Sequence, residues 1–325
     1  MAAAAAYGGG GLGLLGGSLY GLLRAQASLA RRTIGPRQPN PPDSSDVYGP
    51  GLSGSPINLA VLGDSAACGY GMQDPDQTPG ALLAAGLAQQ AQRPVRVAVH
   101  AAIGAESKHL DAQIDRALEA APDVAVIVIG TNDVTHASWP SEVVRLLEAA
   151  VRRLKDSGCE VVVGTCPDLG TVRPIASPLR QIARMLSRRL AAGQTIAVVE
   201  AGGRSVSLGA LLGPEFDREP GRYFGPDQFH PSATGYESMV GALLPSVAAA
   251  IGLAPESEEE PETFRGEGVL PVAYAAAEAA DSAGTEVSGT EVGGRERGAR
   301  GRWVALRHRR RRAIPDVERV GDAEG

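Results

Sequence analysis

The chain has 325 residues, 43% of them hydrophobic and only 4% aromatic, and its formal net charge is −6. The low aromatic content predicts a core built from Ala, Val, Leu and Ile, and the net acidity gives no basic surface that would favour nucleic acid as a partner. The chain has three cysteines, Cys68, Cys159 and Cys166, and an odd number cannot form a closed set of disulfides. We expect all three to be small, buried side chains. No metal-binding spacing of Cys or His appears, and we predict neither a metal nor a cofactor.

Residues 1–34 form an apolar leader that is rich in Ala and Gly. Residues 2–23 carry no charge and are long enough to cross a bilayer, so we expect membrane association through this segment. The arginines that follow favour a cytoplasmic position for the rest of the chain. Ala25-Gln26-Ala27 is typical of a cleavage site, which keeps an exported protein as an alternative, beside a soluble cytoplasmic chain with a disordered leader.

Two further segments have the composition of disordered flanks. Residues 35–56 are rich in Pro, Ser, Gly and Asp, which predicts a linker. Residues 255–325 contain an acidic block at 256–262, a run of small and polar residues, and a basic cluster at 308–312. We expect this tail to be solvated and disordered.

Between these flanks, residues 57–254 alternate short apolar runs with longer helical patterns. This alternation is typical of βαβ units and predicts a three-layer α/β/α sandwich around a five-stranded parallel sheet. Thr78 followed by Pro79 is a typical helix start. The expected strands are 57–62, 95–99, 124–129, 160–164 and 195–199, and the expected helices are 79–92, 107–120, 138–155, 177–192 and 232–251.

Four short motifs follow strands or precede the last helix. They are Gly63-Asp-Ser65 after the first strand, a small-residue turn at 100–107 after the second, Gly130-Thr-Asn-Asp133 after the third, and Asp227-Gln-Phe-His230 before the last helix. In open α/β sheets the carboxyl ends of the strands are where ligands bind. Each motif alone is also an ordinary turn or helix cap. Together they predict one site that collects a hydroxyl, an imidazole and a carboxamide.

In this order and spacing the motifs resemble the SGNH hydrolase superfamily, also called GDSL esterases and lipases, over residues 57–252. The resemblance implies a flavodoxin-like fold and a serine hydrolase mechanism, with Ser65 as the nucleophile, His230 as the base and Asp227 as the group that orients His230. It further implies an oxyanion hole made by the backbone N–H of Ser65, a backbone N–H of Gly104 or Ala105, and the side-chain amide of Asn132.

Two positions depart from the family pattern. Ala66 stands where Leu is usual, and His100 begins the second motif where Asn is usual, which leaves the bonds between the loops open. Asp64 is interpreted as structural, with its carboxylate bonding backbone amides around Ser65, and His109, His136 and His308 as surface or supporting residues.

The resemblance implies hydrolysis of a carboxylic ester through an acyl-enzyme, on a small-molecule, lipid or glycan ester. Two alternatives stay open. One is a non-catalytic, membrane-tethered binding module on the same fold, and the other is acyl transfer to a glycan.

Overall fold

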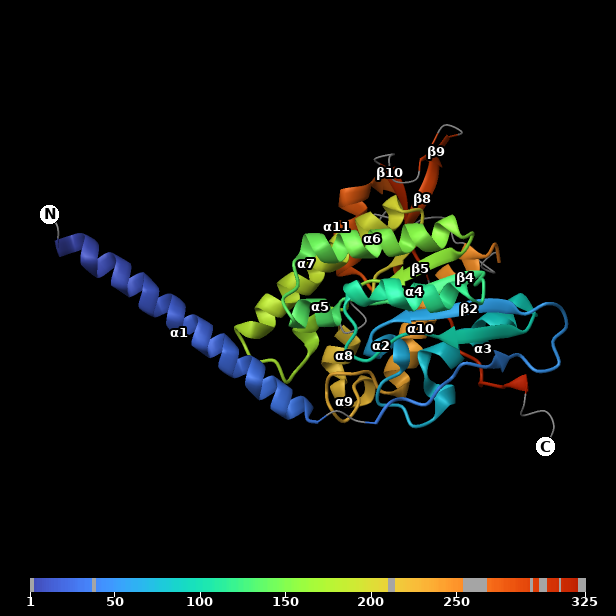
Figure 1. The fold of residues 1–325 in the computed structure, drawn as a ribbon, viewed down its shortest axis with the longest axis horizontal. Helices are drawn as coiled ribbons and strands as arrows, with labels where there is room; N and C mark the ends of the chain where they lie inside the picture. The colour runs from blue at the N-terminus through green and yellow to red at the C-terminus, as the bar shows by residue number, and fades with distance from the viewer. Residues whose placement is uncertain are drawn as a thin grey trace.

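The computed structural model describes residues 3–36, 39–209, 214–253, 268–292, 295–297, 303–309 and 311–320. A single mixed sheet runs through the molecule, and helices cover both of its faces (Figure 1). Its strands are β1 (Val47–Tyr48), β2 (Ile57–Gly63), β3 (Val95–Val99), β4 (Val124–Val128), β5 (Glu160–Gly164), β6 (Arg204–Val206), β7 (Gly268–Pro271), β8 (Thr285–Val292), β9 (Arg295–Arg297) and β10 (Trp303–His308).

The helices fall into long helices that pack on the sheet and short turns that shape the loops. The long helices are α1 (Ala3–Ile34), α3 (Pro79–Ala91), α4 (Leu110–Leu118), α6 (Pro140–Asp156), α7 (Leu179–Glu200), α10 (Ala233–Ala250) and α11 (Val272–Asp281). The short ones are α2 (Ser65–Cys68), α5 (Thr131–Thr135), α8 (Pro214–Arg218) and α9 (Pro220–Tyr223), with 3-10 turns η1 (Pro75–Gln77), η2 (Ser107–His109) and η3 (Leu169–Thr171).

The central part of the sheet is parallel, with strand order β3-β2-β4-β5-β6. These five strands lie in a flavodoxin-like order, and the predicted α/β fold class is confirmed. The whole sheet is larger than predicted, with ten strands in the described residues instead of five. Successive side chains of each strand point to opposite faces. Leu59 and Val61 of β2 therefore pack on the side of α3 and α10, whereas Ala60 and Leu62 pack on the side of α4 and α6.

The fifth predicted strand is misplaced. Residues 195–199 lie in the last turns of α7, and the strand follows as β6. Val198 packs with α4 and α6, while Val199 packs with β8, β10 and α11, so the end of this helix is apolar on two faces. Burial on both faces gives an uninterrupted apolar run that has the pattern of a buried strand. The predicted end of the preceding helix at residue 192 is also wrong, since Gly193 lies inside α7.

The predicted linker is partly built into the domain. Val47 and Tyr48 form β1, which pairs antiparallel with the edge strand β3. The side chain of Tyr48 is fully buried, and its hydroxyl donates to the carbonyl oxygen of Ser44 at 2.9 Å. The segment is ordered because it covers the open edge of the parallel sheet.

The expectation of a wholly disordered tail is wrong. In the described part of residues 255–325, β8 pairs antiparallel with β6, and β10 and β7 extend the sheet beyond it. Helix α11 covers this extension, with Ala275 and Ala279 buried against Val287 and Val304. The acidic block at 256–262 lies outside the described residues. The tail orders itself because it continues a sheet that already exists.

A buried ion pair holds the extension to the domain. The Glu286 side chain is fully buried and contacts Arg309, Arg204 at 2.8 Å and the Ser246 hydroxyl at 2.6 Å. Burial raises the pKa of Glu286, but the hydrogen bonds and charges of the two arginines outweigh it, so the pKa lies below its ordinary value. Part of the basic cluster at 308–312 therefore has a structural role.

The expectation of a membrane-spanning leader is also wrong. Residues 3–34 form helix α1, but no helix in the described ranges combines the length and apolarity needed to span a bilayer. The glycines between residues 8 and 21 have no side chain and so add little apolar surface to the helix. In the rest of the helix, Arg24, Arg31 and Arg32 interrupt the apolar sequence. The C-terminal end of α1 lies against the domain, and its N-terminal end extends away from it (Figure 1).

Candidate active site

The loop after β2 places Ser65 at the carboxyl end of the parallel sheet. Gly63 precedes it with φ +131°, and an added Cβ there would lie 1.9 Å from the carbonyl oxygen of Val128. Only glycine fits both requirements. The buried side chain of Gln113 holds Gly63 from the other side, accepting from its N–H at 2.8 Å and donating to its carbonyl oxygen at 2.9 Å. The backbone that leads into Ser65 is therefore fixed.

Asp64 caps the short helix α2 that begins at Ser65. Its carboxylate accepts from the backbone N–H of Ala66 at 2.9 Å, as the structural interpretation of Asp64 predicted. Asp64 is almost fully buried, and burial raises its pKa to about 7. The nearby charge of Asp133 adds to this rise, whereas the hydrogen bonds from backbone amides partly offset it. In the same helix, burial raises the pKa of the Cys68 thiol to about 12, so this thiol is protonated at neutral pH.

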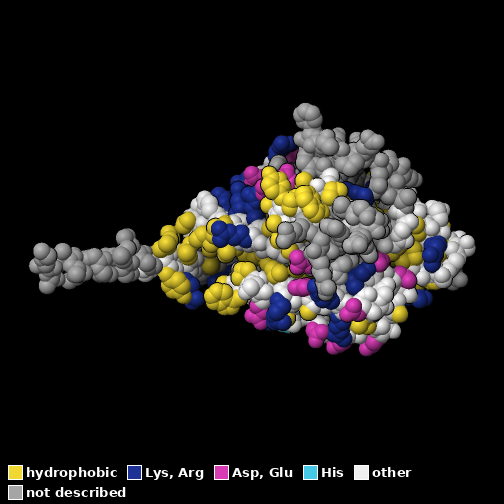
Figure 2. Space-filling view, turned by 90° about the horizontal axis from the view of Figure 1, so that it is seen from above, with side chains coloured by type: hydrophobic (Ala, Val, Ile, Leu, Met, Phe, Trp, Pro, Cys, Tyr) yellow, Lys and Arg dark blue, Asp and Glu magenta, His cyan; other side chains and the backbone are white. Residues whose placement is uncertain are grey.

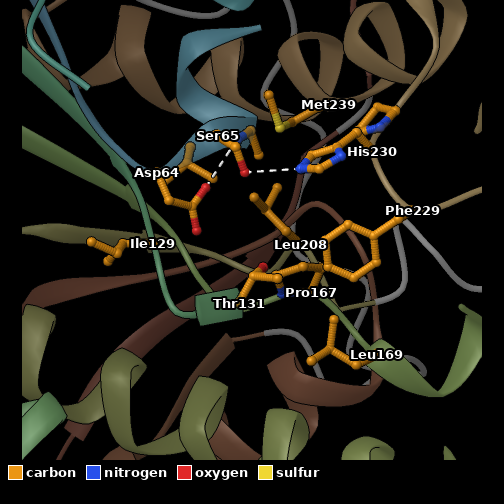
Figure 3. A pocket seen from close by; sticks show the side chains of 13 residues that line it. Asp64, Ser65, Ile129, Thr131, Pro167, Leu169, Leu208, Phe229, His230 and Met239 are labelled. Carbon is orange, nitrogen blue, oxygen red and sulfur yellow. Dashed lines mark hydrogen bonds between the residues drawn. The ribbon is translucent and has the colours of Figure 1, made fainter. Parts of the chain in front are cut away.

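Ser65, His230 and Asp227 form one hydrogen-bonded line. His230 Nε2 lies 3.0 Å from Ser65 Oγ, and His230 Nδ1 lies 2.7 Å from Asp227 Oδ2 (Figure 3 shows the first of these contacts). The chain brings together residues that are 165 positions apart, because β2 ends and α10 begins at the same edge of the sheet. This is the spatial arrangement that the motifs predicted.

The DQFH turn fixes the carboxylate as well as the imidazole. The other oxygen of Asp227 accepts from the backbone N–H groups of Phe229 and His230, both at 3.0 Å. Burial raises the pKa of Asp227, but the bonds from the His230 ring and these two amides outweigh it, so the pKa lies below its ordinary value. The carboxylate is therefore ionised at neutral pH.

Two aromatic rings pack against the imidazole of His230. The Tyr70 ring lies 4.4 Å away between centroids, and the Phe229 ring lies 4.9 Å away in an edge-on arrangement. Neither contact was predicted. The Tyr70 contact joins two loops that are far apart in the sequence, whereas Phe229 immediately precedes His230 in the fourth motif. They limit the rotation of the imidazole around its Cβ–Cγ bond.

The second and third motifs lie next to each other and to the first. The side-chain amide of Asn132 donates to the carbonyl oxygen of Ala105 at 2.9 Å, and the N–H of Ala102 donates to the carbonyl oxygen of Gly63 at 3.0 Å. The N–H of Ala105 donates to Ala102 within the turn at 3.1 Å. Among the described residues, no acceptor is bonded to the N–H of Gly104, which distinguishes it from the N–H of Ala105.

A polar network orders the second motif. Asp133 is buried and accepts from the N–H and the hydroxyl of Ser107 at 3.0 to 3.2 Å. Glu106 contacts Lys108 Nζ at 2.7 Å and accepts from the hydroxyl of Ser138 at 2.9 Å. These bonds, led by that from Lys108, lower the pKa of Glu106 to about 2. Asn132, next to Asp133 in the chain, is thereby held in place.

The side chain of His100, which stands where the family usually has Asn, leaves one ring nitrogen, the buried Nε2, without a hydrogen bond to the described residues. Its backbone still ties the motif to the sheet, because its N–H donates to the carbonyl oxygen of Val61 at 2.8 Å. Burial lowers the pKa of His100 below its ordinary value, which favours the neutral ring.

A cavity of about 50 Å³ opens beside Ser65. It is largely apolar: in Figure 3 Met239 lies above the line from Ser65 to His230, and Leu208, Pro167, Phe229 and Leu169 lie below it. An apolar wall around a charged line of side chains excludes water and strengthens electrostatic interactions inside the site.

Gln194 is a further supporting residue that sequence analysis missed. Its fully buried amide donates to the carbonyl oxygen of Ile129 at 3.0 Å and accepts from the N–H of Cys166 at 2.8 Å. It therefore joins the loop after β4 to the loop after β5, as Gln113 joins α4 to Gly63. The available signal was a glutamine on the apolar face of each helix, because a side chain that is buried there needs polar partners, although the sequence does not say which.

Comparison with known proteins agrees with this geometry. The family model described as GDSL-like Lipase/Acylhydrolase matches residues 61–237, which include Ser65, Asn132, Asp227 and His230. The chain belongs to the GDSL-like lipase/acylhydrolase family. A GDSL-like esterase of Mycobacterium tuberculosis (strain ATCC 25618 / H37Rv) is 40% identical over 236 residues, which cover 69% of this chain and 74% of that relative. The predicted membership of the SGNH superfamily is confirmed, and the chain is a carboxylic ester hydrolase.

More distant likenesses appear among solved structures. An acetylxylan esterase from Geobacillus stearothermophilus is 20% identical, with a TM-score of 0.47, and covers 63% of this chain and 99% of its own. LAE5, an alpha/beta hydrolase from the metagenome of Lake Arreo, Spain, is 19% identical, with a TM-score of 0.45, and covers 62% and 97%.

Proposed function

We propose that this GDSL-family hydrolase cleaves its ester through an acyl-enzyme formed on Ser65. The observation that carries the proposal is the hydrogen-bonded line from Ser65 Oγ through His230 to Asp227. Ser65 Oγ attacks the ester carbonyl carbon, and its proton passes to His230 Nε2. The C–O bond to the alcohol then breaks, and the leaving oxygen takes that proton from the imidazolium.

The second half of the reaction reverses the roles. Water attacks the acyl carbon while His230 Nε2 accepts a proton from it, and the acid leaves as Ser65 regains its hydrogen. Asp227 does not take up this proton. Its ionised carboxylate fixes the tautomer of His230, with the proton on Nδ1, and stabilises the imidazolium.

The developing oxyanion needs donors that already point at it. We assign this role to the N–H of Ser65, the N–H of Gly104 and the side-chain amide of Asn132. Gly104 is preferred over Ala105 because the Ala105 N–H is already bonded to Ala102. One hydrogen of Asn132 Nδ2 is bonded to Ala105, which orients the amide and leaves its second hydrogen for the substrate.

Hydrolysis of p-nitrophenyl esters by the full-length chain tests the proposal, together with labelling by a fluorophosphonate probe. The wild type should hydrolyse at least one acyl length and be labelled at Ser65. Ser65→Ala should remove the labelling and lower kcat by a factor on the order of 10⁶, as in other serine hydrolases. A folded wild-type protein that neither hydrolyses any acyl length nor takes the label would contradict the mechanism and favour a binding module.

A further inference from the structure

A larger cavity of about 330 Å³ lies beside the small cavity at Ser65. The two share three wall residues, Leu169, Phe229 and His230. The larger one is also lined by Asn132 and by apolar side chains from α7 and from the loop that precedes it. Its volume falls in the range of small-molecule sites, about 300–1,000 Å³.

The C-terminal end of α1 forms one wall of this cavity. Ala27, Ala30 and Ile34 line it, and their spacing places all three on one face of the helix. Ala30 is only 5% exposed and packs in a cluster with Leu169 and Ile175. The apolar face of the leader is therefore used inside the molecule, beside the candidate active site.

Polar contacts fix α1 at this position. The side-chain amide of Gln26 donates to the carbonyl oxygen of Ser177 at 2.6 Å, and the N–H of Leu179 donates back to its oxygen at 3.1 Å. This reciprocal pair joins α1 to the start of α7, the helix that supplies the opposite wall. Figure 2 shows hydrophobic side chains gathered around the junction of α1 with the body.

We propose that the larger cavity binds the hydrocarbon chain of the substrate's acyl group, with α1 as part of its wall. The proposal rests on the acyl-enzyme mechanism above, in which the acyl group is the part of the ester that becomes bonded to Ser65. The small cavity at Ser65 holds only the first atoms of that chain. A longer chain continues past Leu169 and Phe229, the wall residues that both cavities share.

The lining selects a hydrocarbon chain over a sugar. Most of the lining is aliphatic, including Ile34 of α1 and Ile182 of α7, so along these walls sugar hydroxyls would lose their bonds to water without replacement. The polar residues Arg31, Thr135 and His136 also line the cavity, but all three are exposed to solvent. The preferred substrates are therefore esters of medium-chain fatty acids.

Substitutions in the wall test the proposal in the full-length chain. Ala27→Trp adds an indole on the cavity side of α1, and Ala25→Trp adds the same group on an exposed position of the same helix. On p-nitrophenyl octanoate, Ala27→Trp should lower kcat/KM about tenfold or more, the effect of losing one or more methylene contacts. On p-nitrophenyl acetate it should stay within about twofold of wild type. Ala25→Trp should leave both values unchanged.

A second variant separates a filled cavity from a displaced helix. Ile182→Trp fills the cavity from α7 without touching the Gln26 contacts, and it should reproduce the loss on octanoate alone. If both cavity variants keep the chain-length profile of Ala25→Trp while the acetate is hydrolysed, the acyl site is wrong and the mechanism stands. The acyl site would also be wrong if the loss of kcat/KM in the cavity variants depended on the length of the alcohol, measured with a series from ethyl acetate to octyl acetate. Absence of hydrolysis at every acyl length would instead contradict the mechanism.

Discussion

The carboxylate of Asp227 holds His230 at two points, its ring and its backbone. One oxygen lies 2.7 Å from His230 Nδ1, and the other accepts from the backbone N–H of His230 at 3.0 Å. Asp227 can reach both the ring and the backbone N–H of His230, only three residues later, because Gln228 adopts φ +56° and turns the chain back on itself. The orientation of the base is thus set within one turn, and Ser65 is supplied by a separate loop.

Asp227→Asn should lower kcat by about 10³- to 10⁴-fold without unfolding the protein. The amide oxygen can still accept from the Phe229 and His230 amides, but the side chain no longer stabilises an imidazolium or enforces the required tautomer. Rates on a p-nitrophenyl ester and a thermal melt measure the two effects. Asp156→Asn, at an exposed position, is the matched control. Activity within tenfold of wild type would mean that another group orients His230.

Asn132→Ala should lower kcat about a hundredfold to a thousandfold, the usual effect of removing one oxyanion-hole donor. KM should change little, because the donor acts mainly on the charge that develops in the transition state. Thr135→Ala, one turn away on the same short helix, controls for disturbance of that helix. Equal losses in the two variants would indicate a structural role for Asn132.

The candidate triad could be predicted because its signals are local. Ser65 follows a strand, and Asp227 and His230 precede a helix, so each motif is readable within a few residues. The fold then brings them together by the general rule for parallel sheets. The supporting residues could not be found in this way. Gln113, Gln194 and Tyr70 act through long-range contacts, and no spacing in the sequence identifies their partners.

The tail escaped prediction for a different reason. Strand β8 reads Thr285-Glu-Val-Ser-Gly-Thr-Glu-Val, a polar sequence with an acidic residue at a position that is fully buried. A carboxylate is acceptable there only because Arg204 and Arg309 lie beside it, and they are 82 and 23 residues away. Composition alone therefore indicates a solvated segment.

Glu286→Ala should destabilise the folded chain by about 3–5 kcal/mol, since it leaves two arginines facing an empty buried site. Urea unfolding measures this, with Glu119→Ala as an exposed carboxylate control. The pKa of Glu286 is lowered in the folded state, so its contribution is present above the unfolded pKa and is lost as pH falls through the lower folded value. A change below 1 kcal/mol would mean that the extension contributes little to stability.

Asp64→Asn should alter how stability depends on pH. Burial raises the folded pKa of Asp64 to about 7, whereas an unfolded Asp titrates near about 3.9. Between these values the folded state binds the proton more tightly, so the wild type loses stability as pH rises from about 4 to 7. The Asn variant carries no such proton and keeps an acceptor for the Ala66 amide.

The difference in unfolding free energy, wild type minus Asp64→Asn, should therefore fall across this pH window and become constant above about pH 8. The other carboxylates titrate in both proteins and cancel in the difference. Urea unfolding of both proteins at pH 5, 6, 7 and 8 measures it, and Asp74→Asn, another helix-capping aspartate, controls for the loss of a capping charge. A difference that does not change with pH would mean that Asp64 is already ionised in the folded protein at pH 5. In that case the bonds from backbone amides, and not burial, would set its charge.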